Sequence, residues 1–277
     1  MKLARLLRME LAKIFGQRGT YVGYGVLAVL VGLITWAMWR YGAPFERALE
    51  GRHDFIVGGK IVSGLSVARF IMEPSMVVLM PLLVAAVSGG LIAGEIQRGT
   101  MRTIMTRPIS RPALIAAKQI AAWVHAVSLT VFLGGFALAL GYIVFGGGEL
   151  VHFRGGLTIL PEQTALLRLA EAYAICALSM CAVASVALLL SQLLQNPLTA
   201  SALTIAFILV GMVLGQIEYF DAIKPYLLST HLVAFGDVIH NTVDISKLVW
   251  PLQCLAAYVL VPSIIGQIIF QYRDITC

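Results

Sequence analysis

The sequence has little charge for its length. Asp, Glu, Lys and Arg make up 12% of its 277 residues, apolar residues make up 59%, and the mean hydropathy is +0.88. A soluble globular domain carries about 25% charged residues. A chain with so few cannot cover a water-facing surface, which excludes a soluble fold. The length suits about six membrane spans in a single domain.

The sequence also lacks a phosphate-binding loop. The nearest match, Gly58-Gly-Lys60-Ile, has no Ser or Thr after the Lys to reach a magnesium ion. The chain is therefore expected not to be an enzyme with its own nucleotide site; if ATP and Mg²⁺ are used, a partner subunit binds them. The four cysteines lie in apolar runs or at the last residue and indicate no disulfide framework.

Long apolar runs dominate what is present. Each reaches or exceeds the roughly 20 residues needed to cross the hydrocarbon of a bilayer. The predicted spans are residues 19–39, 74–94, 113–145, 166–194, 198–216 and 249–270. The third run is longer than a span requires, so we expect a tilt or an extension that carries Lys118 and Gln119. Residues 19–277 are predicted to form one transmembrane domain.

Residues 1–18 are too polar to span and are predicted to form a separate amphipathic helix. A helical wheel places Leu3, Leu7, Leu11, Ile14 and Phe15 on one side and Lys2, Arg5, Arg8 and Lys13 on the other. This pattern is typical of a helix that lies in an anionic membrane interface and contacts lipids. Packing as an ordinary amphipathic core helix is disfavoured, because hardly any soluble protein is available to pack against.

The distribution of charge predicts the orientation. The first 18 residues carry five basic residues and one acid, and residues 95–118 carry the same balance. Basic segments beside membrane spans stay in the cytoplasm. We therefore expect a multi-pass protein of the cell membrane with both termini cytoplasmic and with external loops at residues 40–73, 146–165 and 218–248.

The loop after the second run has a distinctive order of residues. Glu95 is followed by Gly99-Thr100 and then by Arg107-Pro-x-Ser-Arg111. With Met9-Glu10-Leu11-x-Lys13 near the start and Phe270-x-x-Arg273-Asp274-Ile275 at the end, this loop resembles the type-2 ATP-binding-cassette (ABC) transporter permease family, the membrane subunits of exporters. The resemblance extends over most of the chain, and the loop is its most specific part.

The resemblance implies an all-α membrane fold: six transmembrane helices preceded by the interface helix with Glu10 and Lys13. It also implies a cytoplasmic coupling helix between spans two and three that docks onto a separate ABC ATPase subunit. Two ATPase copies and a second permease copy, as a homodimer or a related chain, complete such an exporter. Short external helices are expected in residues 226–240. The scarcity of ionisable groups in the predicted spans favours an apolar or amphipathic cargo, and neither a metal nor a nucleic acid is expected to bind.

The loop residues are suited to docking. Gly99 permits a sharp turn and Thr100 can cap the next helix. An apolar ridge edged by arginines would enter a partner groove. The candidate coupling residues are Glu95, Arg98, Gly99, Thr100, Met101, Arg102, Ile104, Met105 and Arg107, the ridge being Met101, Ile104 and Met105. The alternative is a basic loop that only sets topology. Glu95 would pair with Arg98 or a basic residue of the interface helix, or reach water.

Other features of the spans separate the remaining alternatives. The predicted spans contain almost no ionisable group, which disfavours ion-coupled transport. The rival function is nevertheless an ATP-independent carrier or channel, followed by a membrane enzyme, for which Ser88 and His125 lack a supporting motif. Glycines spaced for close helix packing are candidates for the dimer interface; these are Gly19, Gly23, Gly211 and Gly215.

Overall fold

The computed structural model describes residues 3–42, 63–105, 110–153, 157–239 and 245–272. Its long elements are helices, and six helical segments have the length and hydropathy of membrane spans. These segments are α2 (Arg18–Tyr41), Gly64–Gln97, α7 (Arg111–Phe145), α8 (Glu162–Leu193), α9 (Pro197–Gln216) and Leu248–Tyr272 within α11 (Ile245–Tyr272). The chain thus has the architecture of a multi-pass membrane protein, as its composition predicts.

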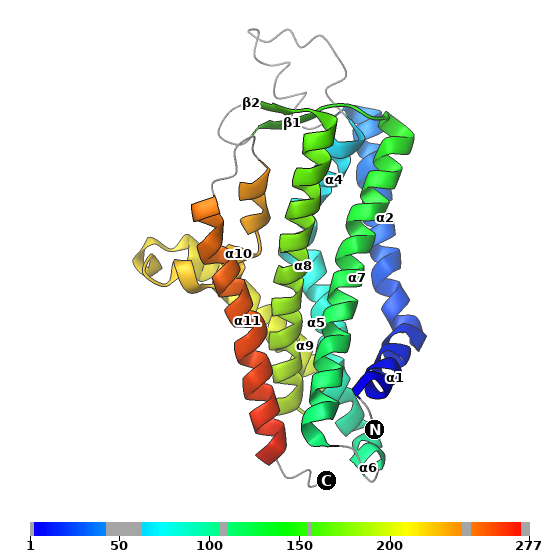
Figure 1. The fold of residues 1–277 in the computed structure, drawn as a ribbon, viewed down its shortest axis with the longest axis vertical. Coiled ribbons are helices and arrows are strands. Elements are labelled where there is room, and N and C mark those ends of the chain that lie inside the picture. The colour runs from blue at the N-terminus through cyan, green and yellow to red at the C-terminus, as the bar shows by residue number, and fades with distance from the viewer. Residues whose placement is uncertain (1–2, 43–62, 106–109, 154–156, 240–244, 273–277) are drawn as a thin grey trace.

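The spans run side by side in an elongated bundle, with α8 between α7 and α11 (Figure 1). α8 is the most buried span and forms much of the core with residues such as Ala172, Cys176 and Met180. Small side chains allow neighbouring helices to approach closely in a membrane. The short helix α6 (Thr100–Met105), α1 (Leu3–Gly16) and the end of α11 lie together at one end of the bundle.

The second span begins earlier than the sequence predicted. Residues 64–73 were expected to belong to a loop, but α4 (Gly64–Pro74) continues through a π-helical turn, Ser75–Leu79, into α5 (Met80–Gln97). Arg69, which lies in this segment, is buried within the bundle. α4 crosses α7 where Gly64 and Gly141 meet, and a side chain at either glycine would collide with the other backbone.

The opposite end of the bundle carries a small antiparallel hairpin. Strand β1 (Leu150–Phe153) pairs with β2 (Leu157–Leu160), with Leu150 opposite Leu160 (Figure 1). The hairpin lies in residues 146–165, which were predicted to be a loop; the other elements of the described structure are helices, in agreement with the expected all-α class. The expected short helices before the last span are present as Lys224–Tyr226, α10 (Leu228–His231) and Ala234–Val238.

The helix α1 packs against the bundle, mainly on α7. It does so through Leu6, Glu10 and Ile14, which are all buried, while Leu3 is 43% exposed. The face that contacts the bundle therefore differs from the apolar side of the helical wheel, since it includes a carboxylate. Only soluble protein had been considered as a packing surface for this helix, whereas the end of the membrane bundle provides a surface that includes Lys118, an ionic partner for Glu10.

Candidate functional site

The expected turn after the second span is present. α5 ends at Gln97, and Gly99 adopts a φ of +69°, a conformation that glycine tolerates best. Thr100 then begins α6, but its hydroxyl donates to the Glu95 carbonyl oxygen at 3.3 Å. This side chain therefore caps the end of α5 instead of the start of α6, and it ties the two helices together.

Four charged side chains from three helices meet beside this turn. We call Glu10 and Lys13 of α1, Glu95 of α5 and Lys118 of α7 the ion quartet. Its nitrogen–oxygen distances are 2.7 Å for Lys13–Glu10, 2.9 Å for Lys13–Glu95, 2.9 Å for Lys118–Glu10 and 2.8 Å for Lys118–Glu95. Each lysine thus bridges both carboxylates. Of the alternatives left open for Glu95, the structure has the ion pair with a basic residue of the N-terminal helix, Lys13, and adds a pair with Lys118.

The charged groups of the ion quartet are removed from water, which costs free energy unless each charge is paired. The Lys118 side chain is fully buried, and those of Glu10 and Glu95 are 3% and 7% exposed. Lys118 also donates to the carbonyl oxygen of Leu91 at 3.2 Å. Buried charges are tolerated when each is paired and hydrogen-bonded, and removing one partner leaves an uncompensated charge. The ion quartet therefore holds α1, α5 and α7 in one relative position.

The charges of the ion quartet shift the pKa values of its α1 members. Burial alone would raise the pKa of the Glu10 carboxyl, but the ammonium groups of Lys118 and Lys13 outweigh burial and lower that pKa. Burial would likewise lower the pKa of Lys13, but hydrogen bonds and charges from Glu10 and Glu95 raise it. Both groups therefore keep their charges over a wider pH range than in an unfolded chain.

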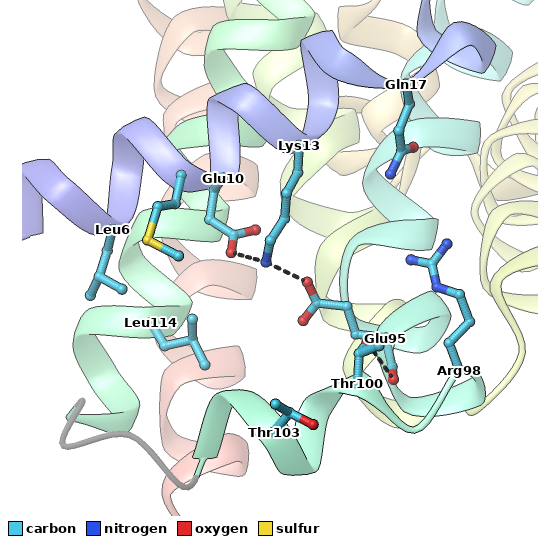
Figure 2. Close-up of a pocket in the computed structure, with 10 residues that line it drawn as sticks. Leu6, Glu10, Lys13, Gln17, Glu95, Arg98, Thr100, Thr103 and Leu114 are labelled. Atoms are coloured by element: carbon cyan, nitrogen blue, oxygen red, sulfur yellow. Dashed lines mark hydrogen bonds and ion pairs between the residues drawn. The ribbon is translucent and has the colours of Figure 1, made fainter.

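A cavity of about 450 Å³ opens beside the ion quartet. It lies between α1 and α6, and we call it the α1–α6 pocket. Figure 2 shows the Glu95 carboxylate directed into this opening. Its lining is Leu6, Met9, Glu10, Lys13, Gln17, Glu95, Arg98, Thr100, Thr103 and Leu114. Within the described part of the chain, the buried oxygen Oε2 of Glu95 has no hydrogen-bond partner.

The structure changes the expected apolar ridge on α6. Met101 is 1% exposed and packs with Ile92, Leu114 and Ile115, so it faces the bundle and is not an exposed contact. The side chains of Arg102, Ile104 and Met105 lie outside the described residues, as does the whole of Arg107. Arg98 is exposed and borders the α1–α6 pocket. Met101 turns inward because an apolar cluster at the end of the bundle accommodates it.

The four glycines proposed for a dimer interface do not share one environment. Gly23 is buried against Leu83 and Leu129, and Gly211 lies against Ser229. These two glycines serve packing within the chain and leave no free face for a second copy. Space is open at the Cβ positions of Gly19 and Gly215, so only these remain candidates for contact between copies.

Lys118 belongs to the candidate site although the sequence alone did not assign it to one. It was expected only in an extension of the third span, whereas it forms the centre of the ion quartet. An ionisable residue inside a long apolar helix is itself a signal of a buried partner. Gln17, which lines the α1–α6 pocket, had no comparable signal.

His125, which was considered for a membrane enzyme, is buried in the bundle. His125 lies among aromatic rings, with ring centroids 6.4 Å from Phe15 and 6.5 Å from Tyr24. Within the described ranges, no group of three His, Cys, Asp or Glu residues could hold a metal ion. His125 is therefore a packing residue that joins α1, α2 and α7.

Comparison with known proteins places the chain in a family. No curated protein matches the chain. A family model described as "Protein of unknown function (DUF2705)" matches residues 25–276, which include all six spans apart from the first turns of α2. The chain therefore belongs to the DUF2705 family.

Proposed function

We propose that this chain is the membrane subunit of an ATP-driven exporter of the type-2 ABC class. Two copies would form the path for an apolar or amphipathic cargo, and two ATPase subunits would act on residues 100–107. The observation that carries the proposal is the ion quartet, which joins three helices directly beside α6. In this proposal that end of the bundle, with both termini, faces the cytoplasm.

The contacts of α6 suit a part that transmits force. Only Arg98 and Gly99 separate α6 from α5, and Met101 anchors α6 among apolar residues of α5 and α7. A partner that displaced α6 would therefore move α5 and α7 with it. Because the ion pairs of Glu95 and Lys118 reach Glu10 and Lys13, α1 would follow the same movement.

The ATP chemistry in this proposal belongs to the partner. The chain has no phosphate-binding loop, so the partner subunits supply the sites for ATP and Mg²⁺. A basic coupling surface that includes Arg98 would meet acidic residues of the partner and orient it.

An ATP-independent carrier is the second candidate, because of Arg69. This residue is 8% exposed within the second span, and its guanidinium lies 5.9 Å from the centre of the Phe235 ring. Buried ionisable residues in membrane spans often mark a substrate or ion path. The expectation that the spans carry almost no such group was made for residues 74–94 of the second span; because this span begins at Gly64, it also contains Arg69, and charge alone does not exclude a carrier.

Recovery of the partner tests the proposal. The tagged chain is purified from its native host in mild detergent, and co-purifying proteins with a phosphate-binding loop are identified and quantified by mass spectrometry. We expect the wild type to retain an ABC ATPase, and we expect Ile104→Asp to lose it. Truncating a central interface residue costs about 2 kcal/mol, about thirtyfold in affinity, and a buried unpaired charge costs more.

Ile159→Asp provides the matched control. Ile159 is 48% exposed on β2, at the opposite end of the bundle, so the same chemical change there should leave the ATPase bound. Recovery of no ABC ATPase with the wild type would refute the proposal. Equal ATPase recovery with Ile104→Asp and the wild type would remove the coupling role of α6.

A further inference from the structure

The α1–α6 pocket has the features of a built binding site. One wall is apolar, with Leu6, Met9 and Leu114, and the other is polar, with Glu95 and Arg98 among its residues. Glu95 is 6% exposed, and its Oε2 points toward the cavity without a hydrogen-bond partner in the described structure (Figure 2). A buried acceptor without a partner is costly. The pocket therefore favours an occupant that brings a hydrogen-bond donor.

The charge around the pocket limits the kind of occupant. Within the ion quartet, two lysines balance two glutamates, so the quartet is neutral as a whole. Arg98, which borders the opening, adds one positive charge. An occupant with one negative charge near Arg98 would bring the net charge of the ion quartet, Arg98 and the occupant to zero. A phosphodiester carries one such charge.

The donor for Glu95 is best supplied by a neutral group. Lys13 and Lys118 already lie 2.9 Å and 2.8 Å from the other oxygen of the same carboxylate. An ammonium group on Oε2 would be a third cation on this carboxylate, and its repulsion by the two lysines would offset much of its attraction to Glu95. A hydroxyl group carries no charge and still forms a strong hydrogen bond to a carboxylate.

The position of the pocket indicates where such a molecule would come from. α1 exposes Leu3 and Met9 together with Arg5 and Arg8, a combination typical of a helix at an anionic membrane surface. Met9 and Leu6 line the pocket and would contact the first carbons of an acyl chain. We propose that the α1–α6 pocket binds an anionic phospholipid with a hydroxyl-bearing headgroup, of the phosphatidylglycerol class, through Glu95 and Arg98.

Competition between two lipids of equal charge tests this site. The full-length chain is reconstituted in phosphatidylcholine nanodiscs that contain phosphatidylglycerol and phosphatidylserine in equal amounts, and retained lipid is measured by native mass spectrometry. Both lipids carry one net negative charge, but phosphatidylserine presents an ammonium group where phosphatidylglycerol presents hydroxyls. We expect phosphatidylglycerol to be retained about tenfold more than phosphatidylserine, because one hydrogen bond to a charged group corresponds to about a tenfold difference in affinity.

Paired variants assign the preference to the pocket. Arg98→Gln should abolish retention, and Met9→Trp should do the same by filling the cavity. Arg8→Gln removes an equal charge from an exposed residue that does not line the pocket, so it should retain the wild-type preference. Each substituted residue is exposed, so the fold should persist, and retention of the α-helical circular dichroism spectrum checks this.

The outcomes distinguish a specific lipid site from bulk attraction to the membrane surface. Equal retention of the two lipids would overturn the proposal, and the pocket would then hold water or a side chain of a partner protein. Equal effects of Arg98→Gln and Arg8→Gln would also overturn it, because bulk attraction to anionic lipid would account for both. The lipid assay contains no ATPase and no nucleotide, so a negative result would not count against the proposed exporter function. Likewise, failure to recover an ABC ATPase would not count against the lipid site.

Discussion

Replacing Lys118 with methionine should destabilise the chain more than the same replacement of Lys13, the other lysine of the ion quartet. Methionine has a similar length and preserves apolar packing along α7, but it removes the ammonium group. The substitution breaks bonds to Glu10 at 2.9 Å, to Glu95 at 2.8 Å and to the Leu91 carbonyl at 3.2 Å. Two buried carboxylates would then share Lys13 alone.

The magnitude follows from the burial of the group. Removing one partner of a buried ion pair costs about 3–5 kcal/mol, since the remaining charge stays in a poor environment. Lys13→Met should cost less, because the Lys13 side chain is 38% exposed and water can replace part of its interaction. The double variant Glu10→Met with Lys118→Met should regain much of the loss, because it leaves one Glu95–Lys13 pair beside an apolar patch.

Equilibrium unfolding in mixed micelles, followed by tryptophan fluorescence, measures these differences. The free energies of unfolding of the wild type, Glu10→Met, Lys118→Met and the double variant complete a double-mutant cycle for Glu10 and Lys118. A loss below about 1 kcal/mol for Lys118→Met would mean that the ion quartet is solvated and not a buried structural unit. If the loss in free energy of unfolding of the double variant equals the sum of the two single losses, Glu10 and Lys118 are not directly coupled.

Two further predictions concern pH and topology. The pKa of Glu10 is lowered from 4.5, so the contribution of Glu10 to stability is complete above pH 4.5 and disappears as the pH falls through its folded-state pKa. The pKa of Lys13 is raised from 10.5, so the contribution of Lys13 is complete below pH 10.5 and disappears as the pH rises through its folded-state pKa. Melting temperatures should therefore form a plateau that falls on both sides, and Glu10→Gln should flatten the acid side; an unchanged acid side would contradict this assignment. In a cysteine-free background, Thr103→Cys should react with an impermeant maleimide only from the cytoplasmic side and Gly147→Cys only from outside, since both positions are exposed and lie near opposite ends of the bundle; the reverse pattern would invert the proposed orientation.

The spans were predictable because hydropathy reports directly on membrane burial. The exception was the segment before Pro74, which was predicted to be a loop and in which Arg69 and Glu73 interrupt the apolar pattern. Arg69 is accommodated inside the bundle beside the Phe235 ring, a long-range contact that local composition does not encode. The hairpin was missed although Leu-Val-His-Phe and Leu-Thr-Ile-Leu flank Arg-Gly-Gly, which is a recognisable strand–turn–strand signal.

The candidate site was predictable only in part. The turn at Gly99 follows from local sequence, and the cost of a lone carboxylate at a membrane boundary indicated that Glu95 needs a partner or water without deciding between Arg98, the N-terminal helix and solvent. The participation of Lys118 depends on how α7 packs against α1, and no spacing rule connects residues that are 108 positions apart. The inward direction of Met101 likewise depends on the apolar cluster that surrounds it.

The separation of Glu10 and Lys118 along the chain has a consequence for biosynthesis. Residue 118 leaves the ribosome 108 residues after Glu10, and at about 5–20 residues per second the delay is about 5–20 s. During that interval the first helix has only its neighbour Lys13 as an ionic partner for Glu10. The bond to Lys118 therefore forms only after the third span has begun to insert. Its formation requires α1 and the start of α7 to have reached their final relative position.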